Sequence, residues 1–169
     1  MRSLAAEKNG TGSRGTDGDV SPTVRNAVVP QADGARRLRI FLVEDNEIIR
    51  ENLVATLEEL ACAQVVGTAV DEWTALQWLL EPDNGCDLVI VDIFLKSGSG
   101  LGVLRGVAGA QPARRMVILS NYATADMRRK CLQLGADSVF DKSNDIDALL
   151  QYCNALASWP GGQPGPGDL

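Results

Sequence analysis

The sequence predicts an α/β domain with a doubly wound, five-stranded parallel sheet. Two observations carry this prediction. Five short apolar runs recur between residues 38 and 142, and each is followed by a segment with helical periodicity. Such alternation favours parallel strands joined by crossover helices. The apolar fraction of 45% is also high enough for a globular core.

Each predicted strand is a short apolar run ending near a polar residue or a turn. The strands are expected at LRIFLV (38–43), AQVVGTAV (63–70), CDLVIVD (86–92), RMVILS (115–120) and SVFDK (138–142).

The intervening segments predict helices over 46–60, 72–80, 101–108, 124–134 and 146–158. One face of the first helix is apolar at Ile49, Leu53, Leu57 and Leu60. Gly135 is a good C-terminal cap for the fourth helix. Asp145 is the expected N-cap of the last helix.

These elements define a domain over residues 38–159. Residues 1–37 are expected to be a disordered extension, because from Asn9 to Gly34 the chain is rich in Gly, Ser, Thr and Asp without a sustained period. Residues 160–169 are expected to form a flexible tail. No second folded domain is expected after Trp159.

Composition excludes several classes of function. The chain has no histidine, which rules out Ser-His-Asp and Cys-His catalysis and a His-rich metal site. Residues 1–37 hold six of the 16 basic and four of the 22 acidic residues, so the remainder carries a net charge of −8. So acidic a domain is a poor candidate for direct binding to nucleic acid.

The sequence also indicates where the protein works. No apolar run approaches the roughly 18 residues needed to span a bilayer. No apolar signal-peptide core follows the first nine residues. We therefore expect a cytoplasmic protein without a membrane partner. The four cysteines lack CxxC spacing and are expected to be reduced, mostly as small core residues.

Polar side chains stand at the ends of four of the five expected strands. They are Glu44 and Asp45 at the end of the first, Asp92 at the end of the third, Ser120 at the end of the fourth and Lys142 at the end of the fifth. Functional groups of open α/β sheets gather beyond these strand ends. Asp92 is especially informative, because a carboxylate at the end of a core strand is costly unless it is paired or open to water.

These residue types together fit phosphoryl transfer. Three neighbouring carboxylates repel one another, and Mg²⁺ would relieve this while keeping several waters. Asp92 would be the nucleophile that forms an aspartyl phosphate. Lys142 would neutralise charge on the transferred group, and Ser120 would donate a hydrogen bond to one of its oxygens.

The segments LVEDN, VIVDIFLKSGSGLGVL, VILSNYA and LGADSVFDKS together resemble the receiver domain of bacterial two-component response regulators. The resemblance implies the flavodoxin-like receiver (βα)5 fold. It also implies phosphorylation of Asp92 by a histidine kinase or histidine phosphotransfer protein. Such a protein catalyses only its own phosphorylation and dephosphorylation, and is otherwise not an enzyme.

The resemblance further assigns ligands and secondary sites. Mg²⁺ would be held by Asp45 and Asp92, by Glu44 mostly through water, and by the backbone carbonyl of Phe94. In the family, the positions of Phe94 and Tyr122 tune how readily water reaches the phosphate. Two large rings there predict slow autodephosphorylation.

The fourth helix is the expected output face. Arg128, Arg129 and Lys130 are consecutive there, and Met127, Cys131 and Leu134 mark the opposite, buried side. In receivers this helix belongs to the usual signalling face. We expect an acidic partner, or a second copy of the protein in a phosphorylation-dependent homodimer, to bind it.

Val139 stands where the family often has an aromatic switch residue, so a ring-flip form of that switch is not expected. Phe140, on the opposite face of the strand, is expected in the core.

Three alternatives stay open at this level. A degenerate receiver would act as a scaffold that never takes phosphate. An Asp-nucleophile phosphatase usually needs a second acid two residues after the nucleophile, where this chain has Phe94. A flavin binder would require Gly, Ser or Thr amides in the first loop, which here reads EDNEI.

Overall fold

The computed structural model describes residues 36–110 and 114–158, all within one compact unit of the chain. The predicted tail at 160–169, and the predicted extension except Arg36 and Arg37, lie outside the described residues. No helix in the described part of the chain is long and apolar enough to cross a membrane.

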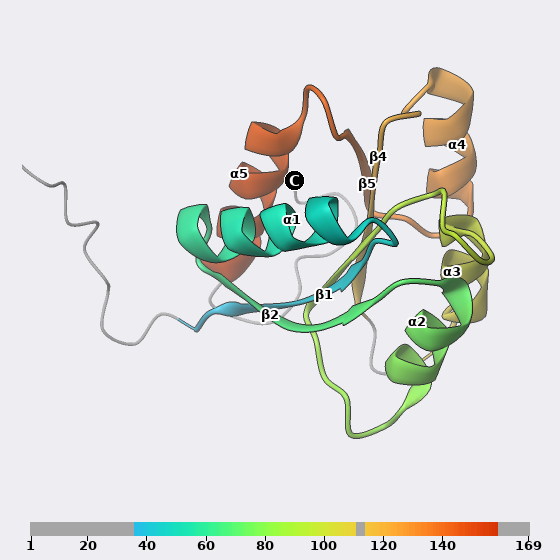
Figure 1. The fold of residues 1–169 in the computed structure, drawn as a ribbon, viewed down its shortest axis with the longest axis horizontal. Coiled ribbons are helices and arrows are strands. Elements are labelled where there is room, and N and C mark those ends of the chain that lie inside the picture. Colours follow the sequence, from blue (N-terminus) through green and yellow to red (C-terminus); the bar gives the residue numbers. More distant parts are fainter. Residues whose placement is uncertain (1–35, 111–113, 159–169) are drawn as a thin grey trace, which may run out of the picture. The chain divides into compact units, whose positions relative to one another are not determined.

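Five parallel strands form one sheet in the order β2-β1-β3-β4-β5 (Figure 1). The strands are β1 Leu38–Val43, β2 Ala63–Ala69, β3 Leu88–Val91, β4 Arg115–Ser120 and β5 Ser138–Asp141. This is the flavodoxin-like receiver fold, and it confirms the predicted fold class. The third strand is shorter than expected, so Asp92 lies just beyond its end.

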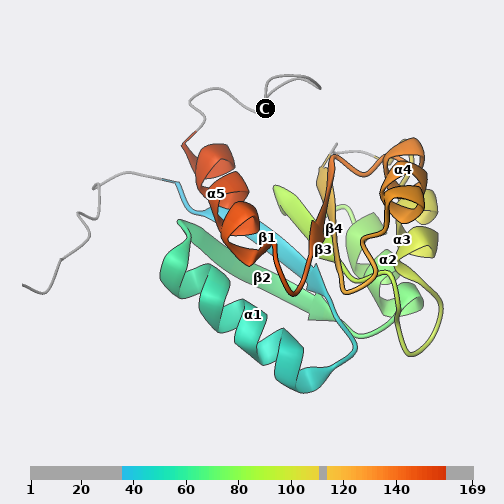
Figure 2. The ribbon, with the colours of Figure 1, turned by 90° about the horizontal axis from the view of Figure 1, so that it is seen from above.

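Five helices alternate with the strands. They are α1 Glu47–Leu60, α2 Glu72–Leu80, α3 Gly100–Gly106, α4 Ala125–Gln133 and α5 Ile146–Ala157. Helices α1 and α5 cover one face of the sheet, and α2, α3 and α4 cover the other (Figure 2). Both faces of the sheet are therefore buried, which explains why its strands read as continuous apolar runs.

The core divides into two clusters, one on each face of the sheet. The α2–α3–α4 side includes Phe41, whose ring stacks on Trp78 with centroids 4.0 Å apart. The α1–α5 side includes Leu57 and Phe140, whereas Val139 belongs to the opposite cluster. The expected core position of Phe140 is confirmed.

Helix ends follow the sequence with two differences. Asn46, Asp71, Ser99 and Thr124 each accept a capping hydrogen bond at their helix N-terminus. Asp145 is the N-cap residue of α5, as expected, but its carboxylate makes no capping bond because it is turned toward β5 and α4. Leu60 is 63% exposed rather than on the buried face, since it is the last residue of α1.

The strand register brings the C-terminal ends of four strands to one level. Val43 of β1 pairs with Val91 of β3, which pairs with Ile118 of β4, which pairs with Val139 of β5. The residues after these positions therefore emerge at one edge of the sheet. Asp92 continues the ladder by donating its backbone N–H to the carbonyl of Val43 at 3.0 Å.

Candidate functional site

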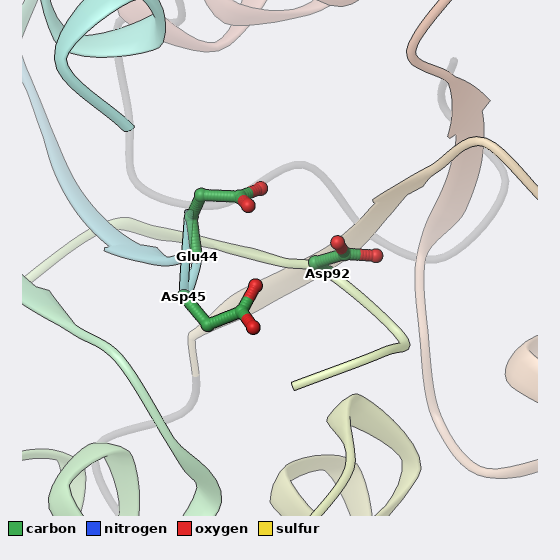
Figure 3. Close-up of side chains that lie close together, drawn as sticks. All are labelled: Glu44, Asp45 and Asp92. Carbon is green, nitrogen blue, oxygen red and sulfur yellow. The ribbon is translucent and has the colours of Figure 1, made fainter. Parts of the chain in front are cut away.

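Three carboxylates meet at the C-terminal edge of the sheet. Glu44 and Asp45 follow β1, and Asp92 follows β3 on the adjacent strand (Figure 3). One oxygen from each lies within 4.8 Å of the others. Glu44 is 1% exposed and Asp92 is 9% exposed. Burying such groups together requires positive charge close by.

Lys142 supplies that charge. Its ammonium donates hydrogen bonds to Glu44 Oε2 at 2.5 Å and to Asp92 Oδ2 at 2.7 Å. Burial would by itself lower the pKa of Lys142, but the hydrogen bonds and charges of Asp92 and Glu44 outweigh it and raise that pKa above its ordinary value. The lysine is therefore charged at neutral pH and joins residues 98 and 50 positions away in the sequence.

The acidic cluster fits a divalent cation. Its ligands are carboxylate oxygens, which Mg²⁺ prefers, and Asp45 leaves the cluster partly open to solvent. Lys142 binds the side of the cluster formed by Glu44 and Asp92. Glu44, Asp45 and Asp92 are thus brought together as predicted, in the acidic triad typical of a receiver Mg²⁺ site.

Ser120 lies at the end of β4, next to β3 in the sheet. Its side chain is fully buried, and its hydroxyl oxygen accepts a hydrogen bond from the Tyr122 N–H at 3.4 Å. Its carbonyl accepts from the Lys142 N–H at 3.3 Å, which ties the two strand ends together. In the bond with Tyr122 the hydroxyl oxygen is the acceptor, so the hydroxyl hydrogen of Ser120 keeps its capacity to donate.

Two aromatic rings from different loops contact each other beside the site. Phe94 and Tyr122 meet edge-to-face with centroids 4.9 Å apart. The Phe94 N–H donates to Asp92 Oδ1 at 3.3 Å, so the loop carrying the ring is joined to the carboxylate itself. The rings are 54% and 62% exposed, so they lie at the surface and contact each other there.

The basic stretch on α4 divides into two kinds of residue. Arg128 donates to the carbonyls of Ala123 and Val139 and to the carboxylate of Asp145. Arg129 pairs with Asp126 on the surface, and Lys130 is exposed. Arg129 and Lys130 face outward, whereas Arg128 is only partly exposed and holds α4 to neighbouring segments. Sequence periodicity could not predict the bonds of Arg128. It shows which side of a helix a residue lies on, but it does not show which backbone carbonyls of other segments lie within reach.

The buried cysteines are core residues. Burial raises the pKa of the Cys86 thiol to about 11 and that of Cys153 to about 12, so both are protonated at neutral pH. Cys131 is also buried, whereas Cys62 is exposed. All four are free, and three of them pack as small apolar side chains, as predicted.

Comparison with known proteins agrees with this geometry. The family described as response regulator receiver domain matches residues 40–154. A probable transcriptional regulatory protein from Picosynechococcus is 32% identical over 130 residues, which cover 74% of this chain and 51% of the relative. A gliding motility regulatory protein from Myxococcus xanthus is 28% identical, with 82% and 18% covered. The chain thus spans about half or less of these two relatives.

Solved structures show the same likeness. A two-component response regulator of the LuxR family from Aurantimonas superposes with a TM-score of 0.65 at 27% identity, over 73% of this chain and 86% of the other. The response regulator domain of Thermotoga maritima CheB superposes with a TM-score of 0.64 at 20% identity, covering 75% and 100%. The second match bears on the fold alone.

Proposed function

Because the chain belongs to the response regulator receiver domain family, we propose that it accepts a phosphoryl group on Asp92 and signals through protein contact. The observation that carries this proposal is the buried Asp92 carboxylate, held by Lys142 at 2.7 Å beside Glu44 and Asp45. A structural carboxylate would need a partner, but it would not need two further acids at the same point. The domain matched by the family is a receiver, not a catalytic domain.

The proposed reaction forms one bond and breaks one. An Asp92 oxygen attacks phosphorus, and the bond from phosphorus to the donor's imidazole nitrogen breaks, with the electron pair leaving on that nitrogen. Lys142 is placed to neutralise charge on the phosphoryl oxygens, and Ser120 can donate its hydroxyl hydrogen to one of them. Because the chain has no histidine, the phosphohistidine belongs to a histidine kinase or phosphotransfer protein.

Mg²⁺ fits the proposal as the resident cofactor. Asp45 and Asp92 would bind it directly, Glu44 mostly through water, and the Phe94 carbonyl would complete the protein ligands. When bound, it would supply positive charge to the phosphoryl oxygens. The protein's own contribution is to gather the three carboxylates, which repel one another, and to hold Lys142 against two of them.

For output we propose the exposed part of α4, namely Arg129 and Lys130. Both are solvent-exposed on an acidic domain, which favours an acidic partner surface or a second copy of the protein. Arg128 joins this helix to β5 and to the loop before α5, so it belongs to the support of the surface.

Mass spectrometry of the intact protein tests the acceptor assignment. The full chain is incubated with Mg²⁺ and a small phosphodonor, and an acid-stable, base-labile adduct of one phosphoryl group is expected. Asp92→Asn should abolish this adduct while leaving the fold intact. Asp126→Asn, which removes an exposed acid on α4, is the matched control and should keep it. A full-yield adduct on Asp92→Asn would rule out the assignment, and no adduct on the unaltered protein would favour the scaffold alternative.

A further inference from the structure

The loop after Asp92, residues 94–99, is held by a residue of a different helix. The Glu72 carboxylate, at the first turn of α2, accepts a hydrogen bond from the Ser99 N–H at 2.8 Å. The Glu72 N–H in turn donates to the Ser97 carbonyl at 3.2 Å. One residue thus bonds the loop through both its backbone and its side chain, 27 positions away in sequence.

Two glycines make room for this contact. A side chain at Gly98 would overlap the side chain of Glu72, and Gly98 also has a φ of 77°, which favours glycine. A side chain at Gly102, in α3, would overlap the Glu72 carboxylate. The Glu72 side chain therefore occupies a space that exists because both neighbours lack a Cβ.

Glu72 is linked to Asp92 through two intervening residues, Ser99 and Phe94. Ser99, held by Glu72, pairs with Phe94 in an isolated antiparallel β-bridge across the loop. Phe94 donates its N–H to Asp92 and packs its ring on Tyr122. The loop is closed at its far end by the Gly100 N–H, which donates to the carbonyl of Ile93 at 2.9 Å. Without the bond from Glu72, Ser99 would lose one of the contacts that hold it opposite Phe94.

We propose that Glu72 is a positioning residue that holds loop 94–99 so that the Phe94 backbone stays against the acidic cluster. The inference rests on the proposed function, in which the Phe94 carbonyl is a Mg²⁺ ligand. Removing a group that orients a metal ligand typically lowers the affinity for the metal by about 10–100-fold. We expect an effect near the lower end, because Glu72 acts through Ser99.

The test measures Mg²⁺ affinity of the full chain by calorimetry, together with the half-life of the phosphoryl adduct. Glu72→Ala should weaken Mg²⁺ binding about 10-fold. At saturating Mg²⁺ it should also shorten the adduct's half-life, because the released loop would no longer hold the Phe94 ring where it hinders water. Glu72→Gln should restore both, because its amide oxygen can accept from the Ser99 N–H. Glu81→Ala, which removes an exposed acid just after α2, is the matched control and should change neither.

Gly102→Ala provides a second variant that does not depend on the stability of Glu72→Ala. The added methyl displaces the end of a flexible side chain, and alanine favours the helix. It should weaken Mg²⁺ binding as Glu72→Ala does, and the double variant should bind no more weakly than Glu72→Ala. Thermal unfolding without Mg²⁺ checks that each variant is folded.

The outcomes separate this inference from the proposed function. An adduct on the unaltered protein with unchanged Mg²⁺ affinity in Glu72→Ala and Gly102→Ala would overturn the positioning role alone. A defect in Glu72→Ala that Glu72→Gln does not restore would also overturn it, because the effect would then come from charge. An unaltered protein that forms no adduct would contradict the proposed function instead.

Discussion

Lys142 and Arg128 each use one cation to join distant segments, but in different surroundings. Lys142 is 9% exposed at its side chain and bonds two buried carboxylates at the sheet edge. Arg128 is 39% exposed and bonds two backbone carbonyls and Asp145, which is itself 33% exposed. The first contact compensates buried charge, whereas the second fastens α4 to β5 and to the loop before α5.

The difference indicates which contact can take part in chemistry. Buried charges interact strongly and are weakly screened, so an added cation or phosphoryl group would perturb the Lys142 cluster more than the Arg128 contact. The Arg128 contact is screened by solvent and contributes mainly geometry. The loop after β4 contacts both the acidic site and α4. The ring of Tyr122 contacts Phe94 beside the site, and the carbonyl of the next residue, Ala123, accepts a hydrogen bond from Arg128.

The largest expected effect comes from removing the buried cation. Lys142→Met leaves Glu44 and Asp92 buried without their partner, and breaking a buried pair costs about 3–5 kcal/mol. We expect the free energy of unfolding to fall by about 3 kcal/mol in urea titrations without Mg²⁺, and Mg²⁺ to recover part of this loss. Arg128→Met is the matched comparison and should cost less. Equal losses would show that burial does not distinguish the two contacts.

A smaller effect is expected at the rings of Phe94 and Tyr122. If they hinder water at Asp92, Phe94→Asn should shorten the half-life of the phosphoryl adduct several-fold. Decay is followed by intact mass after the phosphodonor is removed. Leu132→Asn, at a half-exposed apolar position on α4, is the control and should decay at the original rate. An unchanged half-life in Phe94→Asn would mean that the rings shield nothing.

The smallest effect concerns the output surface. Arg129→Glu with Lys130→Glu should weaken phosphorylation-dependent self-association, or capture of an acidic partner, without lowering the unfolding midpoint. Sedimentation of the phosphorylated protein and a pull-down measure this. Arg128→Met should instead lower the midpoint by a few degrees. If the double reversal leaves both association and capture unchanged, α4 loses the proposed output role.

Much of the fold and site follows from local pattern. The apolar runs and helical periods predict the five strands and five helices. The spacing of apolar residues indicates whether a segment buries its side chains as a strand or as one face of a helix. The polar residues at the strand ends predict a cluster of charged side chains, because a parallel sheet brings those ends to one edge. These residues are Glu44, Asp45, Asp92, Ser120 and Lys142. The structure confirms that these strand ends lie at one edge, because Val43, Val91, Ile118 and Val139 pair in succession across four strands.

The sequence by itself therefore determined the sheet, its helices and the acidic and basic residues gathered at the C-terminal edge of the sheet. Tertiary structure decided the contacts of Glu72, Arg128 and Asp145. In the sequence, Glu72 is the first residue of an expected helix, Arg128 is one of three consecutive basic residues and Asp145 is an expected helix cap. Each of them bonds the backbone of another element. The physical reason is that a backbone amide or carbonyl is present at every residue. Its pairing with a distant side chain depends on where folding places it, and sequence pattern does not record that.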